Sequence, residues 1–237
     1  MLAPLLNMKK MLLVFGAIAM LGGPIILPAR AVSNFQLADN RESQPSEFTA
    51  GLLTLEDLPD GFRELPPSIS AQISQQFLAL SSQFQQGGLD PQEFFVFYHP
   101  ASLEVVFGFT GEIADIAFFD ASLQLLKESP DLQQSIIDQV QEKLKNVAIA
   151  ELTELRIVPT EEMADNSIGV KAGMKVLGMS FQGDLISFRR DSTGGFAAVM
   201  YRQSRSPQIS ADALAGTMDG KIVELSEGER IGDRPTD

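Results

Sequence analysis

Apolar and polar positions alternate along this chain with two periods, and these periods predict its helices and strands. Between residues 67 and 86 the apolar residues recur every three or four positions, a spacing that places them on one side of a helix. They are Ile69, Ile73, Phe77, Leu80 and Phe84. Gly87-Gly88 predicts the end of this helix, because glycine readily adopts the positive φ of a helix terminus.

The same spacing predicts further helices in the middle and at the end of the chain. Around residues 113–127 the expected buried positions are Ile116, Phe119, Leu123 and Leu126. Ser129-Pro130 predicts an N-cap and a first helical residue for a helix that runs to Asn146. Its inward positions would be Ile136, Val140 and Leu144. Ser210 predicts the cap of a last helix that reaches about Val223.

Runs of β-branched and aromatic residues predict the strands. Glu93–His99 and Leu103–Thr110 are expected to form a hairpin. Four more strands are expected at Ile149–Val158, Ile168–Phe181, Leu185–Arg190 and Phe196–Gln203, with turns at 182–184 and 191–195. Because connections this short favour antiparallel pairing, we expect one α+β domain over residues 50–226. Its largely antiparallel sheet of about five to six strands would be backed by helices, and residues 227–237 would form a flexible tail.

The first 31 residues have the three parts of an export signal. Lys9 and Lys10 precede an uncharged stretch from residue 11 to 29, and Ala29-Arg30-Ala31 follows it. This order predicts cleavage after Ala31, a flexible linker over residues 32–49, and a mature protein in the periplasm or thylakoid lumen. The alternative is an uncleaved membrane anchor at residues 11–29, because that length approaches a bilayer span; membrane contact is expected only in that case.

Charge and cysteine usage narrow the possible functions. The chain has a net charge of −13, with 18 Lys+Arg against 31 Asp+Glu. Removing residues 1–31 would take away three basic residues and make it −16. Such a charge repels nucleic acid and anionic membrane surfaces, so a nucleic-acid partner is not expected. With no cysteine, the chain has no lipoprotein anchor, disulfide or thiol nucleophile.

Catalytic and cofactor motifs are not found in the sequence. His99 is the only histidine, and no G-x-S-x-G nucleophile motif or glycine-rich phosphate loop occurs. Glu56, Asp57 and Asp60 cluster without the alternating spacing of a calcium loop. We therefore expect no catalytic residue, cofactor or metal ion, and a protein that is not an enzyme.

Two surfaces are candidates for contact with a partner or ligand. The first is the polar side of the helix at 67–86, because no charged residue occurs from Leu65 to Leu89. Its candidate contact residues are Gln72, Gln75, Gln76 and Gln83. The second is a group of arginines, Arg189, Arg190, Arg202 and Arg205, which could bind a carboxylate or phosphate. Alternatively, the helix face is simply solvated, and the arginines pair across strands, with Arg202 near Asp184 if the turn at 191–195 is tight.

Several segments together resemble a known group of proteins. They are LEDLPDGF, NSIGVKAG, SFRRDSTGGFAAVMYRQ and the last helix, SADALAG. Their spacing is similar to that of a group of exported cyanobacterial proteins of unknown function, over roughly residues 50–225. The order of elements also loosely resembles the fold of the lumenal extrinsic subunit P of photosystem II. This resemblance implies a non-enzymatic accessory protein of the lumen or periplasm, and it transfers no site residue.

Three hypotheses of function follow from these patterns. The leading one is an exported accessory domain that docks on a membrane complex or on another exported protein. The second is a small-ligand binding or sensing domain, with an apolar pocket lined by Phe94, Phe107, Phe109, Phe119 and Phe188. The third is a hydrolase that uses carboxylates and His99. The sequence does not give the oligomeric state.

Overall fold

A computed structural model describes residues 49–50, 52–86, 88–145, 150–160, 163–176 and 178–232 of the chain. The expected export signal, the cleavage site after Ala31 and nearly all of the expected linker lie outside these residues.

One sheet organises the described part of the chain. Its long strands are β3 (Leu89–His99), β4 (Glu104–Ile113), β5 (Ala150–Val158), β6 (Asn166–Val176), β7 (Met179–Arg190) and β8 (Thr193–Arg202). The order is β1-β3-β4-β8-β7-β6-β5, and every pairing between long strands is antiparallel. The two-residue strands β1 (Thr49–Ala50) and β2 (Arg63–Glu64) both pair with β3. The α+β class is therefore confirmed, with eight described strands rather than five to six.

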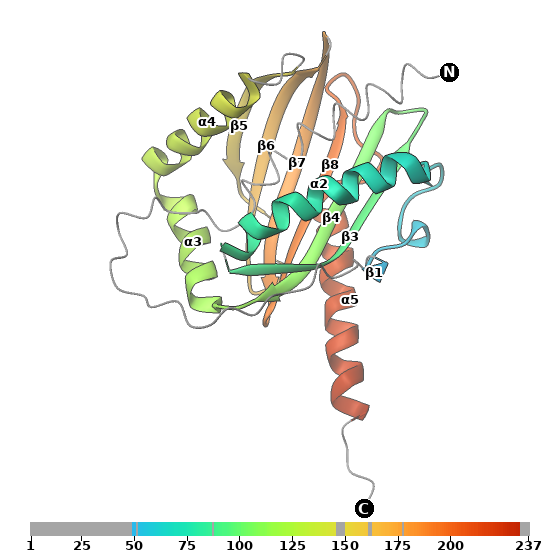
Figure 1. Cartoon of the computed structure of the whole chain (residues 1–237), viewed down its shortest axis with the longest axis vertical. Coiled ribbons are helices and arrows are strands. Elements are labelled where there is room, and N and C mark those ends of the chain that lie inside the picture. Colours follow the sequence, from blue (N-terminus) through green and yellow to red (C-terminus); the bar gives the residue numbers. More distant parts are fainter. Residues whose placement is uncertain are drawn as a thin grey trace, which may run out of the picture.

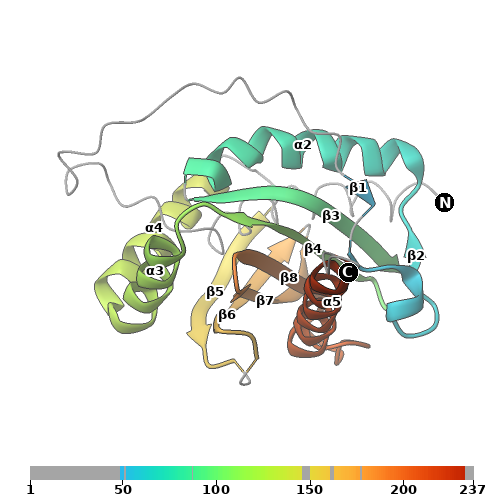
Figure 2. The ribbon, with the colours of Figure 1, turned by 90° about the horizontal axis from the view of Figure 1, so that it is seen from below.

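Helices cover both faces of the sheet. Those on one face are α2 (Pro67–Gln86), α3 (Ile116–Glu128) and α4 (Pro130–Lys145). Figure 1 shows α2 running across β3 and β4, with α3 and α4 beyond its end, beside β5 and β6. The opposite face carries α5 (Ala211–Gly232) and the segment around the short 3-10 helix η1 (Leu55–Asp57). Figure 2 shows α2 and α5 on opposite sides of the sheet.

The helices begin at residues that the sequence marks as helix starts, namely a proline and three capping side chains. Pro67 occupies the first position of α2, where its missing N–H would have no partner in any case. Asp115 accepts a hydrogen bond from the backbone N–H of Phe118 at the start of α3. Ser129 and Ser210 likewise accept from Leu132 and Ala213. The predicted caps of the last two helices are thus confirmed.

Alternating side chains of the strands build two hydrophobic cores. On the face of α2, α3 and α4, Phe77, Phe84 and Phe119 pack on Phe109 and Phe196 of the sheet. On the other face, α5 inserts a row of small and apolar residues over β7 and β8. They are Ala211, Leu214, Ala215, Met218 and Ile222. Because both faces of β4 and β8 are covered, nearly every residue of these two strands is buried.

The strands after β5 differ from the sequence prediction in register. The expected strand Ile168–Phe181 is divided between β6 and β7 by a turn at Gly178, which has a φ of +80°. The expected turn at 182–184 is instead the middle of β7, paired with residues 171–173 of β6. Gln182-Gly183-Asp184 is a turn-like tripeptide, but alternation continues through it, with Phe181 and Leu185 on the same face.

Two further boundaries also differ. The turn between β7 and β8 contains only residues 191 and 192 rather than 191–195. The last helix extends to Gly232 rather than to about Val223. Packing on the sheet explains why the helix forms as far as Ile222 despite the low helix propensity of Gly216 and Gly220. Beyond Ile222 the helix projects past the sheet, and Leu225 is 59% exposed (Figure 1).

Candidate functional site

Arg189 and Arg190 are consecutive on β7, so their side chains point to opposite faces of the sheet. Arg189 donates through Nε and Nη2 to the two carboxylate oxygens of Asp120 on α3, at 2.9 and 2.8 Å. Its Nη1 also donates to Asp165, at 2.9 Å. The hydrogen bonds from Arg189 hold the pKa of Asp120 below its usual value.

Arg190 makes the corresponding contacts on the other face. It donates to both oxygens of Asp219 on α5, at 2.8 and 2.6 Å, and to Asp165 at 3.3 Å. The hydrogen bonds to Asp219 raise the pKa of the Arg190 guanidinium. Both arginines thus lie in ion pairs with two helices and the loop before β6, contacts that no local spacing in the sequence reveals.

Arg202 and Arg205 do not join this group. Arg202 pairs in register with Phe181, whereas Asp184 pairs with Val199. The expected proximity of Arg202 to Asp184 is therefore wrong, because the shorter turn after β7 shifts the register by three positions. Asp184 instead accepts from the Tyr201 hydroxyl at 3.0 Å. Arg205 donates to the carbonyl oxygen of Ala101 at 3.1 Å.

Helix α2 presents an uncharged outer face. Ala71 and Gln75, one helical turn apart, are both exposed. Gln85, also exposed, donates to Asp90 at 2.7 Å. The side chains of Gln72, Gln76 and Gln83 lie outside the part of the chain that the structure describes.

Helix α3 exposes more apolar surface than the sequence pattern predicts. Phe119, Leu123 and Leu126 are buried as expected, but the prediction for Ile116 is wrong, since 40% of it is exposed. It is the first residue of the helix, and the buried row begins one turn later. Phe118 and Leu125 are 37% and 41% exposed. With the exposed residues Ala117 and Ala121 they form a second row on the helix, which we call the α3 stripe.

The α3 stripe starts beside the C-terminal end of α2. The backbone N–H of Ala114 donates to the carbonyl oxygen of Gly88 at 2.9 Å. A Cβ atom at Gly88 would lie 4.0 Å from Cδ1 of Phe118. The sequence signal that could have revealed the stripe is the number of large apolar residues in this helix, which exceeds what one buried row accommodates.

His99 and Ser102 interact within the loop between β3 and β4. The Nδ1 atom of His99 lies 2.9 Å from Oγ of Ser102 and accepts from the backbone N–H of Ser102 at 3.2 Å. The Nε2 atom faces Gly61, and the ring contacts Phe62 edge-on at 5.3 Å. A catalytic triad would place a carboxylate at the second ring nitrogen, whereas Nε2 of His99 faces Gly61. The contact between His99 and the buried Ser102 instead closes the loop between β3 and β4.

Glu104 is a buried carboxylate that sequence reasoning did not single out. It is 1% exposed. Its oxygens accept from the backbone N–H groups of Gln208, at 3.0 and 2.8 Å, and Ile209, at 3.4 Å. Burial raises its pKa. Glu104 therefore holds the segment before α5 against the sheet.

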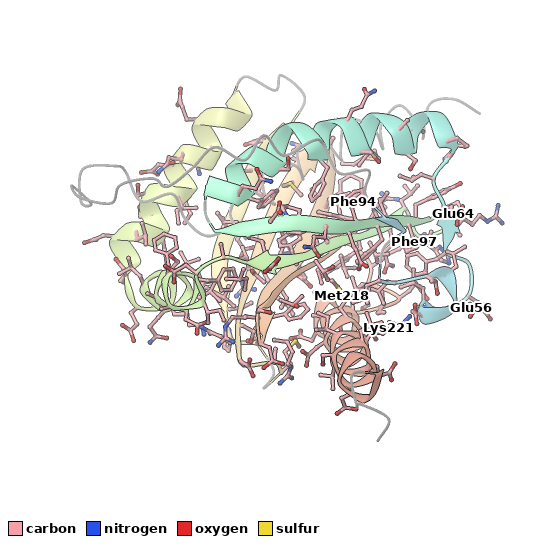
Figure 3. All side chains as sticks on the ribbon, turned by 60° about the horizontal axis from the view of Figure 1, so that its bottom comes forward. Glu56, Glu64, Phe94, Phe97, Met218 and Lys221 are labelled. Carbon is pink, nitrogen blue, oxygen red and sulfur yellow. The ribbon has the colours of Figure 1, made fainter. Side chains whose placement is uncertain are left out.

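The N-terminal segment is attached to α5 by a further ion pair. Lys221 donates to Asp57 at 2.6 Å and to the carbonyl oxygen of Leu52 at 3.3 Å. Figure 3 shows Met218 and Lys221 on α5, close to the segment that carries Glu56. Asp57 thus has a structural partner, and no group of three or more His, Asp or Glu placed to hold a metal occurs within the described residues.

An apolar cavity of about 150 Å³ lies at the other end of the sheet, between α4 and β5. The expected lining of five phenylalanines is wrong. Phe109 packs on Phe77 and Phe196 with ring centroids 5.0 and 5.3 Å apart, so these rings fill the core. Phe188 lies in the core on the α5 face.

Comparisons with known proteins add no relative. No family model matches the chain, and a search of curated proteins finds no similar sequence. Among the described helices, none combines the length and apolar character that crossing a membrane requires.

Proposed function

We propose that this chain is an exported, non-catalytic domain that docks on a protein partner through the α3 stripe and the adjoining uncharged face of α2. One observation carries the proposal: Phe118 and Leu125 of the α3 stripe are 37% and 41% exposed, and the exposed Ala117 and Ala121 lie beside them on the same side of the helix. Clustered exposed apolar side chains are typical of protein interaction surfaces.

Energetics favour covering this surface with another protein. Fully burying a side chain of this size stabilises by about 1.5–3 kcal/mol, and a partner would gain part of that for each residue. The neighbouring face of α2 adds contact area, and because it carries no charge its burial avoids the large penalty of desolvating an ion.

The charge distribution indicates the chemistry of the partner. Exposed acidic residues flank the α3 stripe, with Glu112 and Asp115 before it and Glu128 after it. An acidic rim around an apolar centre is complementary to an apolar groove with basic edges. A protein surface of this kind fits better than a lipid surface, since the acidic chain is repelled by anionic membranes.

The test introduces charge into the stripe without weakening the helix. Ala121→Glu with Leu125→Lys places a Glu–Lys pair at i and i+4, which stabilises a helix by about 0.2–0.5 kcal/mol and leaves the net charge unchanged. The matched control is Ser135→Glu with Gln139→Lys, an exposed pair with the same spacing on α4.

Wild type, the α3 variant and the α4 control would each be expressed in the native organism and crosslinked there. The crosslinked complexes would be purified from the membrane fraction, and the partner identified. Binding of the purified partner would then be measured. We expect wild type and control to bind the same partner with equal affinity, and the α3 variant to bind at least tenfold more weakly. Equal binding by all three, or no partner above background, would overturn the proposal, as would binding to protein-free vesicles that accounts for all membrane recovery.

A further inference from the structure

The cavity between α4 and β5 is distinct from the α3 stripe. Its walls come from the end of α3, from α4, and from the strands β5 and β6. The lining residues are Leu126, Gln133, Ile136, Ile137, Leu155, Arg156, Ile157 and Val170. Six of the eight are aliphatic, so the interior is a hydrocarbon surface.

The two polar residues of the lining, Gln133 and Arg156, already have partners. Gln133 donates its amide to the carbonyl oxygens of Leu126, at 2.8 Å, and Lys127, at 3.4 Å. Arg156 is exposed, and its Nε lies 2.9 Å from Glu154. Among the described residues, Asp184 and Ser187 have buried polar atoms without a partner, and neither lines the cavity.

These features make the cavity a poor site for ordered water. It is open to solvent on one side, and water beside aliphatic walls finds few of the two to four polar partners that hold an ordered water in place. An apolar molecule that replaces this water gains dispersion contacts with the walls.

We propose that this cavity binds a small, uncharged apolar molecule with the size of one six-membered ring or a short branched chain. Its volume supports this size, because a cavity of about 150 Å³ with a similar lining in another protein accommodates benzene. Entry is possible from the side of Ile137, Leu155 and Ile157, which are only partly buried. An anionic ligand is disfavoured, since Glu154 already neutralises Arg156.

The proposal is tested by NMR of isoleucine methyl groups in the protein purified from its own cells. Ile136, Ile137 and Ile157 line the cavity, whereas Ile73, Ile168 and Ile186 lie in the cores and act as internal references. We expect benzene to shift the first three methyl signals in a saturable way, and benzoate to bind at least tenfold more weakly.

A variant that fills the space provides the second measurement. Ile137→Phe should weaken benzene binding at least tenfold and raise the thermal midpoint of the free protein. Leu155→Phe fills the same space from the strand if Ile137→Phe does not fold. Ile69→Phe, a partly buried position on α2, is the matched control and should bind benzene as wild type does. Absence of saturable shifts, stronger binding of benzoate, or unchanged binding by the filled variants would overturn the proposal.

Discussion

At the scale of single residues, two carboxylates that are shielded from water make the stability of the fold depend on pH. Asp120 and Glu104 are both carboxylates that accept several hydrogen bonds, but the pKa of Asp120 is lowered and that of Glu104 is raised. The difference arises because Asp120 accepts hydrogen bonds from the guanidinium of Arg189, whereas the burial of Glu104 outweighs the hydrogen bonds that it accepts from backbone N–H groups. The two residues therefore make opposite contributions to stability as pH changes.

Replacing Asp120 with Asn is expected to lower the free energy of unfolding by about 1–2 kcal/mol at neutral pH, through loss of charged hydrogen bonds to Arg189. Since the pKa of Asp120 is lower in the folded state, its stabilisation is present above 3.8 and is lost as pH falls through the folded value. The free energies of unfolding of wild type and variant should therefore converge as the pH falls below 3.8. Urea unfolding at several pH values measures it, with Asp60→Asn at an exposed turn as control.

Replacing Glu104 with Gln tests the opposite sign. Gln retains one acceptor oxygen but places an N–H₂ group against a backbone donor, so we expect a loss of about 1–2 kcal/mol at neutral pH. Because the folded-state pKa is raised, wild type loses stability as pH rises from 4.5 through that pKa. Its advantage over the variant should therefore grow as pH falls. An advantage that grows with rising pH would contradict this assignment; Glu112→Gln, exposed on the same strand, is the control.

At the scale of elements, substitutions at two glycines distinguish the effect of side-chain packing from that of helix propensity. A Cβ atom at Gly195 on β8 would press against the Phe188 ring, whereas one at Gly216 on α5 would meet nothing within 4 Å. We expect Gly195→Ala to destabilise by about 1–3 kcal/mol through overpacking. Gly216→Ala should stabilise by about 0.5–1 kcal/mol. Thermal unfolding measures both. Stabilisation by Gly195→Ala would contradict the packing of Phe188 against β8, and destabilisation by Gly216→Ala would contradict the open surroundings of Gly216.

The helices were predictable because their signals are local. Pro67 and Gly88 mark the two ends of α2. Ser129 and Ser210 cap the starts of α4 and α5. The β6–β7 turn was mispredicted because Gln182-Gly183-Asp184 and Gly178 offer similar local signals. Only cross-strand packing, which places Phe181 against Met174, selects Gly178. Register of this kind is a long-range property.

The candidate site was less predictable for the same reason. That Arg189 and Arg190 face carboxylates depends on Asp120 and Asp219, which lie 69 and 29 residues away in the chain. The α3 stripe depends on which of two apolar rows the sheet covers, and the helix sequence does not encode that choice.

At the scale of the whole molecule, the export hypothesis gives a direct prediction. Mass spectrometry of the protein from its own cells should find Val32 at the N-terminus, because Ala29 and Ala31 are the small residues that the peptidase requires. A first residue within 1–11 would instead support the alternative membrane anchor, and the domain would then remain attached to the bilayer.

The adjacency of Arg189 and Arg190 has a mechanical consequence. One arginine holds α3 and its neighbour holds α5, so a single peptide unit of β7 joins the two ion pairs. A partner that pulls on α3 would therefore transmit part of the tension through these ion pairs to α5. Under such a force, these two charged pairs would bear the tension together with the packing of the layers.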